Sequence, residues 1–452
     1  MKGTMTTISF VSVWGFLSLL LFSLNVNAAA AQNPSKVEIK KTDNAYQLYV
    51  NSKPFYVKGV GLGWSQGRNL QALKQAGGNS VRTWNSDSAD EVLAKAKQLG
   101  VMVALGFDMQ KQLHGFDYDD EQAVKAQFAR FKSVVEKYKN HPNLLVWVIA
   151  NEPNLLFAED GSLAAVNPKV YQAIHEMIEY VHQSDPNHPV TYTFAGAIKE
   201  HIDTALHYTP TVDILSVQVY GDLQILPEAI TAIDRDLPVM VTEYGPKGFW
   251  EMPKTSWGRE IEEPSGVKAK SMMERIQHTL VNDTTGKIIG NFAFFWGQKQ
   301  ERTPTWFGMF NKDGSANARV DEMTRFWTGK YPINRAPLTM SMTMNERLAQ
   351  ASVIVSAEQQ AIAKVVVFDP DGDDLQHHWR ILKEVDVRSN GGAFELEPEQ
   401  VNVDVLQTNT TADGVSLTFR APEKEGEYRL FIYSYDGKGK VGNANFPFKV
   451  EH

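Results

Sequence analysis

The chain has 452 residues, 43% hydrophobic and 22% charged, which is the composition of an ordinary globular protein with room for one large and one small domain. The formal net charge is −8 and no basic block is present, which excludes nucleic acid and an anionic membrane surface as natural partners. The absence of cysteine excludes disulfides, a thiol nucleophile and thiolate metal sites.

Residues 1–31 are expected to form a signal peptide. Lys2 supplies a positive start, residues 8–24 are mostly apolar, and small residues at 28–31 offer a cleavage site. The alternative is a retained membrane anchor, but the apolar run is short for a span and small residues follow it. The pattern therefore predicts a secreted or periplasmic protein whose mature chain has no integral membrane span.

Residues 36–331 alternate between strand and helix signals after a hairpin at 46–54 that turns at Asn51-Ser52. Apolar spacing at Ile174, Met177, Ile178 and Val181 is typical of one face of a helix. Helices are expected at 70–75, 89–99, 121–139, 168–183, 267–281 and 320–327. Strands are expected at 56–62, 80–84, 101–108, 144–151, 189–194, 214–220, 238–243 and 291–296.

This alternation of eight units predicts an α/β fold of the (β/α)8 TIM barrel type. An open doubly wound sheet is the alternative, but no glycine-rich phosphate loop follows the first strand. Prolines at 332 and 337 mark an expected linker at 332–349. The short alternating strands of residues 350–452 then predict a small all-β immunoglobulin-like sandwich, which either contacts polysaccharide or acts as a spacer.

Two apolar strands end in a glutamate. The first, residues 144–151, is followed by Glu152 and Pro153, and the second delivers Glu243 ahead of Tyr244-Gly245. Because parallel strands place their carboxyl ends at one rim of a barrel, both carboxylates are expected there. Paired carboxylates cleave glycosidic bonds: one protonates the leaving oxygen, and the other attacks the anomeric carbon or activates water. For either glutamate taken alone, a structural cap or ion pair is the alternative.

Asn151-Glu152-Pro153 and Thr242-Glu243-Tyr244-Gly245, in this order on a barrel, resemble clan A of the retaining glycoside hydrolases, and most closely its families 2 and 5. The resemblance covers about residues 36–330. It implies that Glu152 is the acid/base, that Glu243 is the nucleophile, and that Asn151 hydrogen-bonds the sugar 2-hydroxyl. No cofactor is implied.

Further rim residues match the clan's pattern. Arg82 resembles the arginine that keeps the nucleophile ionised, Tyr220 a residue that donates to it, and Trp296 the tryptophan under the cleaved sugar. The structural alternative is an ordinary ion pair for Arg82 and a core position for Trp296. Other candidates for substrate contact are the aromatic residues and polar side chains near the rim: Trp64, Trp84, Trp306, Asp108 and His114.

The insert at 246–264, with Trp250 and Trp257, is expected to shape the cleft. No metal ligands are assigned. The acidic stretch from Asp369 to Asp374 is expected to form a turn, with a calcium site as the alternative. It lacks the distal glutamate of a helix-loop-helix calcium loop.

The function expected from these features is exported retaining β-glycoside hydrolysis of a β-linked polysaccharide or oligosaccharide. The substrate is expected to be a β-glucan, including β-1,3-linked glucans, or a β-mannan. A β-glucan transglycosylase would differ only in the acceptor, and a non-catalytic carbohydrate-binding module is the alternative outside enzymology.

Overall fold

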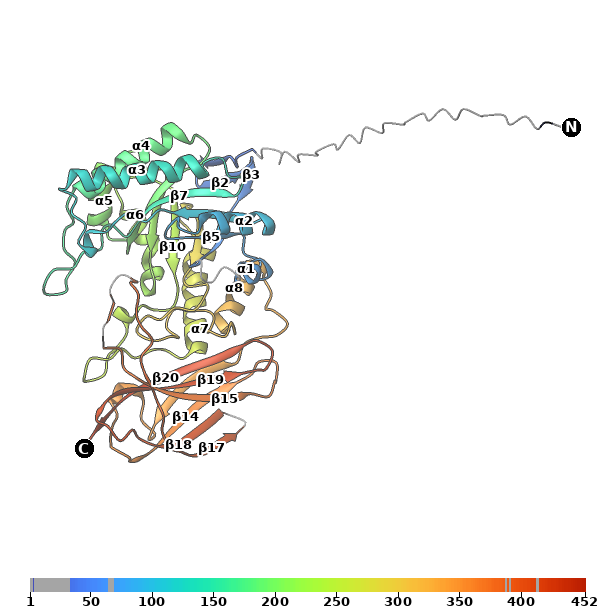
Figure 1. Ribbon diagram of the computed structural model, residues 1–452, viewed down its shortest axis with the longest axis vertical. Coiled ribbons are helices and arrows are strands. Elements are labelled where there is room, and N and C mark those ends of the chain that lie inside the picture. Colours follow the sequence, from blue (N-terminus) through green and yellow to red (C-terminus); the bar gives the residue numbers. More distant parts are fainter. Residues whose placement is uncertain (1–2, 4–32, 64–68, 387, 390–391, 412–413) are drawn as a thin grey trace.

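The computed structural model describes residue 3 and residues 33–63, 69–386, 388–389, 392–411 and 414–452 (Figure 1). The predicted signal peptide therefore lies outside the described residues, apart from Gly3. Among the helices that are described, none has both the length and the apolar character needed to cross a bilayer. Export of the chain stays a prediction.

Eight parallel strands close into a barrel, which confirms the predicted (β/α)8 fold (Figure 1). The strands are β4 (Val57–Gly61), β5 (Ser80–Arg82), β6 (Met102–Gly106), β7 (Leu144–Asn151), β8 (Val190–Ala195), β9 (Leu215–Gln218), β10 (Val239–Tyr244) and β11 (Ile288–Ala293). The helices between and after them are α1 (Asn69–Gln75), α2 (Ala89–Leu99), α3 (Glu121–Tyr138), α4 (Lys169–Ser184), α5 (Lys199–Tyr208), α6 (Leu226–Ala232), α7 (Ser265–Ile276) and α8 (Ala318–Thr328).

The burial of these elements follows from their sequences. Every residue of β7 except Asn151 is buried, as an apolar strand inside a ring of helices requires. The four apolar residues singled out on α4 are all buried. Helix α3 begins where the Asp120 carboxylate accepts hydrogen bonds from the N–H groups of Gln122 and Ala123, which are otherwise unpaired at a helix start.

A small sheet covers the amino ends of the barrel strands. Its strands are β1 (Val37–Lys41), β2 (Tyr46–Val50) and β3 (Lys53–Phe55), and the predicted hairpin joins the last two through Asn51 and Ser52, both with positive φ. Val37 and Leu48 pack against residues that start barrel strands, among them Val57 and Met240. This end of the barrel is closed, so the opposite rim is the open one.

The C-terminal part is a sandwich of two sheets, as predicted. One sheet contains β12 (Leu338–Met344), β14 (Gln360–Phe368), β18 (Gly414–Arg420) and β17 (Val405–Thr411). The other contains β13 (Ile354–Ser356), β20 (Val441–Glu451), β19 (Gly426–Tyr435), β15 (Gln376–Lys383) and β16 (Gln400–Val401). The predicted linker at 332–349 is wrong from Leu338 onward, because β12 lies within it and pairs with β14.

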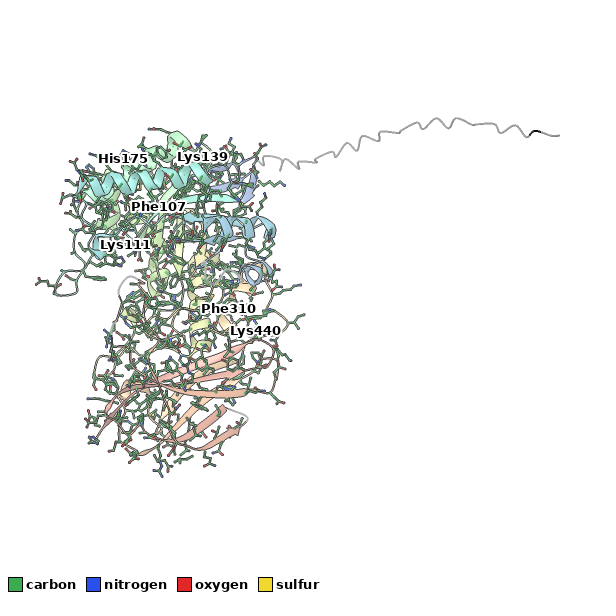
Figure 2. The ribbon with its side chains drawn as sticks, viewed as in Figure 1. Phe107, Lys111, Lys139, His175, Phe310 and Lys440 are labelled. Carbon is green, nitrogen blue, oxygen red and sulfur yellow. The ribbon has the colours of Figure 1, made fainter. Side chains whose placement is uncertain are left out.

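Buried polar contacts join the barrel to the sandwich. Helix α7 packs on β12 and β20, and its Lys268 forms, within the barrel, an almost fully buried ion pair with Glu262. Asn445 of β20 donates to the same Glu262 carboxylate. Lys440, beside the sandwich in Figure 2, pairs with Asp321 of α8. Since breaking a buried pair leaves an uncompensated charge, these contacts favour one fixed arrangement of the two domains.

Candidate active site

Both glutamates lie at the open rim because of the strands that carry them, β7 and β10, which β8 and β9 separate in the barrel. Glu152 follows directly on β7, and its N–H donates to the backbone oxygen of Thr193 on β8 at 3.1 Å. Glu243 is the fifth residue of β10 and pairs in register with Gln218 of β9. Both strands run in the same direction, so both side chains belong to the carboxyl end of the barrel.

Glu243 is held by three donors from three other positions on the rim. Arg82 Nη1 and Trp84 Nε1 donate to Oε1 at 2.6 and 2.7 Å, and the Tyr220 hydroxyl donates to Oε2 at 2.8 Å. The Arg82 side chain is fully buried, and Glu243 is 5% exposed. Three donors directed at both oxygens fix the carboxylate in one orientation. Such a group is suited to nucleophilic attack.

Glu152 has a different environment. Its backbone has φ of +51°, an uncommon value for a residue other than glycine, and such values cluster at functional sites. Burial raises the pKa of Glu152 to about 7, the Lys111 ammonium at 3.8 Å opposes this rise, and the charge of Glu243 adds to it. A carboxyl group that holds its proton near neutral pH can act as a general acid.

The side chain of Asn151 lies between Glu152 and Arg82, the arginine that pairs with Glu243. Its Oδ1 accepts hydrogen bonds from Arg82 Nη2 at 2.5 Å and from Gln218 Nε2 at 2.7 Å. This fixes the amide so that Nδ2 lies on the side of Glu152, 3.5 Å from Oε2. The Asn151 amide N–H group can therefore donate to a substrate hydroxyl without changing its other contacts.

Three functional side chains were missed by the sequence analysis. Gln218 is the last residue of the buried strand β9, just as Glu152 directly follows the buried strand β7. A polar residue at the end of an apolar strand is therefore the sequence pattern that could have identified Gln218. Lys111 lies in the segment after β6 (Figure 2), for which the sequence indicated Asp108 and His114. Glu301 is buried on the loop after β11, and its pKa is raised, first by burial and further by the charges of Glu395 and Glu243, while Lys299 lowers it.

Trp296, the tryptophan expected to lie under the sugar, does not face the active site. Trp296 is fully buried, donates from Nε1 to the backbone oxygen of Asn69, and packs on Phe310 and Trp327. It is a core residue. Phe294 lies two residues earlier and contacts both Trp84 and Tyr220 edge to face, with ring centroids 5.7 and 6.0 Å apart. Phe295 also packs on Trp84, at 5.7 Å, so Phe294 is the aromatic residue of this segment that contacts both Trp84 and Tyr220.

The remaining candidates have different positions. Trp306 is 1% exposed and donates to the backbone oxygen of Lys247, so it supports the aromatic cluster from within and offers almost no surface for the predicted substrate contact. Trp84 is half-buried and contacts Glu243 directly. Trp250, in the predicted insert, is 56% exposed and packs edge to face on Tyr220. Trp64 lies outside the described residues.

Asp108 and His114 are both exposed. The Asp108 carboxylate accepts a hydrogen bond from Gln110 Nε2 at 3.3 Å, and His114 ends a 3-10 helix, η2 (Gln112–His114). The side chain of this segment that reaches the acid is Lys111. The position after the third barrel strand thus indicated the segment that borders the active site, but it did not identify Lys111 as the side chain that faces Glu152.

Within the described ranges, no group of histidine and acidic side chains is arranged to hold a metal ion. The acidic stretch at 369–374 forms a turn in which Asp369 Oδ1 accepts from the N–H groups of Asp371 and Asp373. Asp371 accepts from the N–H group of Arg335, and Asp373 pairs with Lys438. These contacts engage one oxygen of each carboxylate, whereas Asp369 Oδ2 and Asp373 Oδ2 are buried without a hydrogen-bond partner among the described residues.

Comparisons with known proteins agree with this barrel. Curated relatives include the β-glucuronidases of Sus scrofa, 23% identical over 282 residues, and of Streptococcus agalactiae, 25% identical over 341 residues. These alignments cover 55% and 65% of this chain, but only 40% and 54% of the relatives, so the chain spans about half the length of the proteins it matches.

Two solved structures have a similar fold. Ruminococcus gnavus β-glucuronidase matches with a TM-score of 0.50 at 18% identity, over 66% of this chain and 53% of that one. A calcium-binding mutant of Bacteroides uniformis β-glucuronidase 2 matches with a TM-score of 0.51 at 14% identity, over 92% of this chain and 48% of that one. The family model described as glycosyl hydrolases family 2, TIM barrel domain, matches residues 37–329. The chain therefore belongs to glycosyl hydrolase family 2 through its TIM barrel domain.

Proposed function

We propose that this protein is a retaining β-glycoside hydrolase that acts by double displacement. The observation that carries the proposal is the contrast between the two rim carboxyl groups. Glu243 accepts hydrogen bonds from Arg82, Trp84 and Tyr220, whereas burial raises the pKa of Glu152 to about 7. Two carboxyl groups in such different environments are suited to act as nucleophile and acid.

In the first step, Glu152 donates its proton to the leaving oxygen while a Glu243 oxygen attacks the anomeric carbon. The aglycone leaves and a glycosyl-enzyme ester forms on Glu243. Glu152, now ionised, then removes a proton from water, which attacks the same carbon and releases Glu243. The Asn151 amide donates to the sugar 2-hydroxyl, a contact that strengthens in the transition state.

The proposed substrates are neutral β-linked sugars of the β-glucan or β-mannan type. Three described cations near the site are each paired with a carboxylate: Arg82 with Glu243, Lys111 with Glu152 at 3.8 Å, and Lys299 with Glu301 at 3.2 Å. Glu301 adds negative charge, since it raises the pKa of Glu152 through electrostatic repulsion. This balance disfavours a substrate that brings its own carboxylate.

A β-glucuronide is the second candidate. It is supported by the names of the curated relatives and by Lys111, because a lysine can pair with a uronate. Initial rates on p-nitrophenyl β-glucoside, β-mannoside and β-glucuronide, and on laminarin and glucomannan, separate the two candidates. A kcat/KM for the glucuronide that exceeds those of the neutral glycosides would reject the neutral-sugar assignment. Turnover of none of them would reject the hydrolase.

Transfer to a sugar instead of water remains the alternative chemistry, since both use the same glycosyl-enzyme. Product analysis at high oligosaccharide concentration distinguishes them: longer products indicate a transglycosylase, and shorter ones a hydrolase. Secretion or periplasmic location is likewise proposed, on the pattern of residues 1–31.

The pH dependence provides a test of Glu152 as the acid. Because Glu152 must be protonated to act, kcat/KM is expected to fall as the pH rises through about 7. Lys111 lowers the pKa of Glu152, so Lys111→Met should raise that pKa and move the alkaline limb to higher pH by about one unit. The measurement is kcat/KM against pH on an aryl glycoside.

Lys125→Met is the matched control, because Lys125 is an exposed lysine on α3 that pairs with the equally exposed Glu121. Its profile should equal that of the unmodified protein. An alkaline limb that stays in place in Lys111→Met would show that another group controls it.

A further inference from the structure

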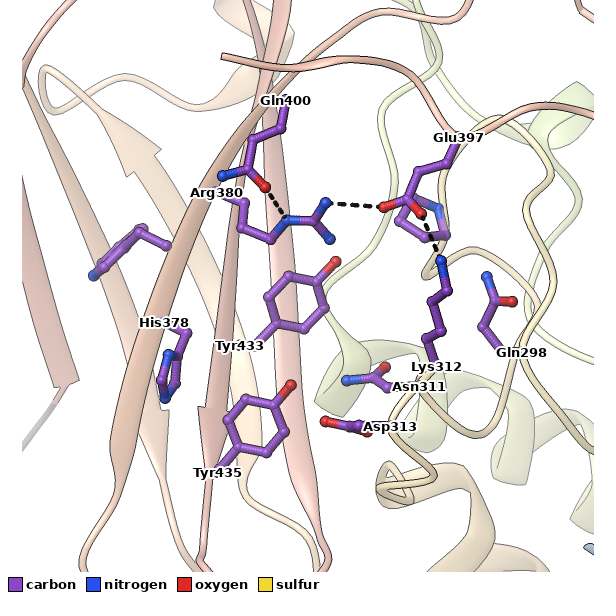
Figure 3. Close-up of a pocket in the computed structure, with 12 residues that line it drawn as sticks. Gln298, Asn311, Lys312, Asp313, His378, Arg380, Glu397, Gln400, Tyr433 and Tyr435 are labelled. Carbon is purple, nitrogen blue, oxygen red and sulfur yellow. Dashed lines mark hydrogen bonds and ion pairs between the residues drawn. The ribbon is translucent and has the colours of Figure 1, made fainter. Parts of the chain in front are cut away.

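A cavity lies away from the two glutamates, between the barrel and the sandwich (Figure 3). Its volume is about 650 Å³, within the range of roughly 300–1,000 Å³ that is usual for small-molecule sites. One wall is the outer face of β15 and β19, and the other is the barrel loop that follows β11. Neither the family match nor the catalytic chemistry assigns a role to this cavity.

The sandwich wall presents aromatic rings in register. Tyr433 and Tyr435 are two residues apart on β19 and therefore share one face of the sheet. His378 pairs with Tyr433 across the antiparallel ladder, and its ring lies edge to face on Tyr435 at 5.5 Å. Figure 3 shows the two tyrosine rings one above the other along this wall. Aromatic faces of this kind suit the apolar face of a pyranose ring.

Polar groups of both kinds surround these rings. Arg380 donates to Gln400 at 2.8 Å and to Glu397 at 3.0 Å, and Lys312 lies 3.7 Å from Glu397. Asn311 and Asp313 lie on the opposite wall (Figure 3). Two cations, Lys312 and Arg380, thus face two carboxylates, Asp313 and Glu397, so the lining carries no excess charge. An uncharged ligand with many hydroxyl groups matches such a lining better than an anion does.

The barrel wall also connects the cavity to the catalytic rim. Gln298 lines the cavity and lies two residues beyond Trp296, on the loop that continues through Lys299 to Glu301. The charge of Glu301 acts on both catalytic glutamates. Lys299 also donates to the backbone oxygen of Gly392 in the sandwich at 3.0 Å. A ligand in the cavity would therefore contact the same loop that borders the active site.

We propose that this cavity is a secondary binding site for a neutral oligosaccharide segment, which holds a polysaccharide chain while another part of it is cleaved. This deepens the proposed function, on which the choice of a neutral glycan rests. The site requires both domains, because its aromatic wall is on the sandwich and its facing loop is on the barrel. The sandwich then takes part in substrate binding instead of acting only as a spacer.

The test uses the full chain with Glu243→Ala, so that bound glycan is not degraded. Affinity electrophoresis in gels that contain laminarin, mixed-linkage β-glucan or glucomannan compares this parent with double variants that add Tyr435→Ala or His378→Ala. Gln407→Ala is the matched control, because Gln407 is exposed on β17 of the other sheet. Loss of one stacking ring should raise the apparent dissociation constant roughly three- to tenfold, with no change for Gln407→Ala.

Kinetics in the unmodified background give the second readout. Tyr435→Ala should raise KM for the polysaccharide while kcat/KM on p-nitrophenyl glycosides stays the same. Equal retardation of the Tyr435, His378 and Gln407 variants, or retardation by none of the three glycans, would overturn the secondary site. Failure of the unmodified protein to hydrolyse any glycoside would instead overturn the proposed function, and the gel comparison would still report on the cavity.

Discussion

Replacement of Glu243 by alanine is expected to reduce kcat on aryl glycosides by about 10⁴-fold or more, the scale seen when an enzyme loses its nucleophile. The geometry explains the size of this effect. Arg82, Trp84 and Tyr220 all donate to this one carboxylate, so the variant loses the attacking oxygen and leaves three donors without their acceptor. Steady-state rates, with the protein's fold checked by circular dichroism, measure the change.

Addition of azide to Glu243→Ala tests whether Glu243 is the nucleophile. In Glu243→Ala, the space left by the side chain lies on the face from which the nucleophile attacks. Azide bound there should restore turnover and give a glycosyl azide of inverted configuration, because the displacement then occurs only once. Glu228→Ala is the control, since Glu228 is exposed on α6 and its loss should leave the rate unchanged. Near-normal activity of Glu243→Ala would end the assignment.

The sequence predicted the parts of this fold that depend on long apolar patterns. Strand β7 was predicted with its observed bounds because eight consecutive residues that must be buried on both faces leave little choice of structure. Helices α5 and α6 were not predicted. Helix α6 has only seven residues and starts at Leu226-Pro227, so its pattern is too short to give a clear period.

The candidate site was predictable where a residue's role follows from a strand end. Glu152, Glu243 and Arg82 end or follow buried strands, and the structure places Arg82 against Glu243. Side chains on loops were not predictable in this way. Lys111 and Glu301 enter the site through the course of the backbone after β6 and β11, which no local spacing records. Trp296 illustrates the converse, because an aromatic residue near a strand end can turn into the core.

The same reasoning applies to the linker. Pro332 and Pro337 are poor strand residues, and they led to an expected boundary at residue 350. The residues after Pro337 alternate methionine with serine and threonine, and this is strand β12. This alternation alone does not identify a strand, because a strand at a domain boundary is stabilised by pairing as much as by its own composition. Here the pairing partner is β14.

Replacement of Glu152 by alanine is expected to have the second-largest effect, and its size should depend on the leaving group. General acid catalysis contributes about 10²- to 10⁴-fold, so kcat/KM for glycosides with poor leaving groups should fall by that factor. A 2,4-dinitrophenyl glycoside needs little protonation, so its kcat/KM should change much less. The fall in rate above about pH 7 should also disappear, because the group with the raised pKa is gone.

Azide also tests the role of Glu152, and its product should have the configuration opposite to that from Glu243→Ala. In Glu152→Ala the glycosyl-enzyme on Glu243 still forms, and azide enters in place of the water that Glu152 would have activated. The product should be a glycosyl azide of retained configuration, because two displacements have occurred. Opposite configurations from the two alanine variants would assign acid and nucleophile independently of any rate. Equal losses of kcat/KM for good and poor leaving groups would contradict the role of Glu152, since a group that only positions the sugar does not distinguish between them.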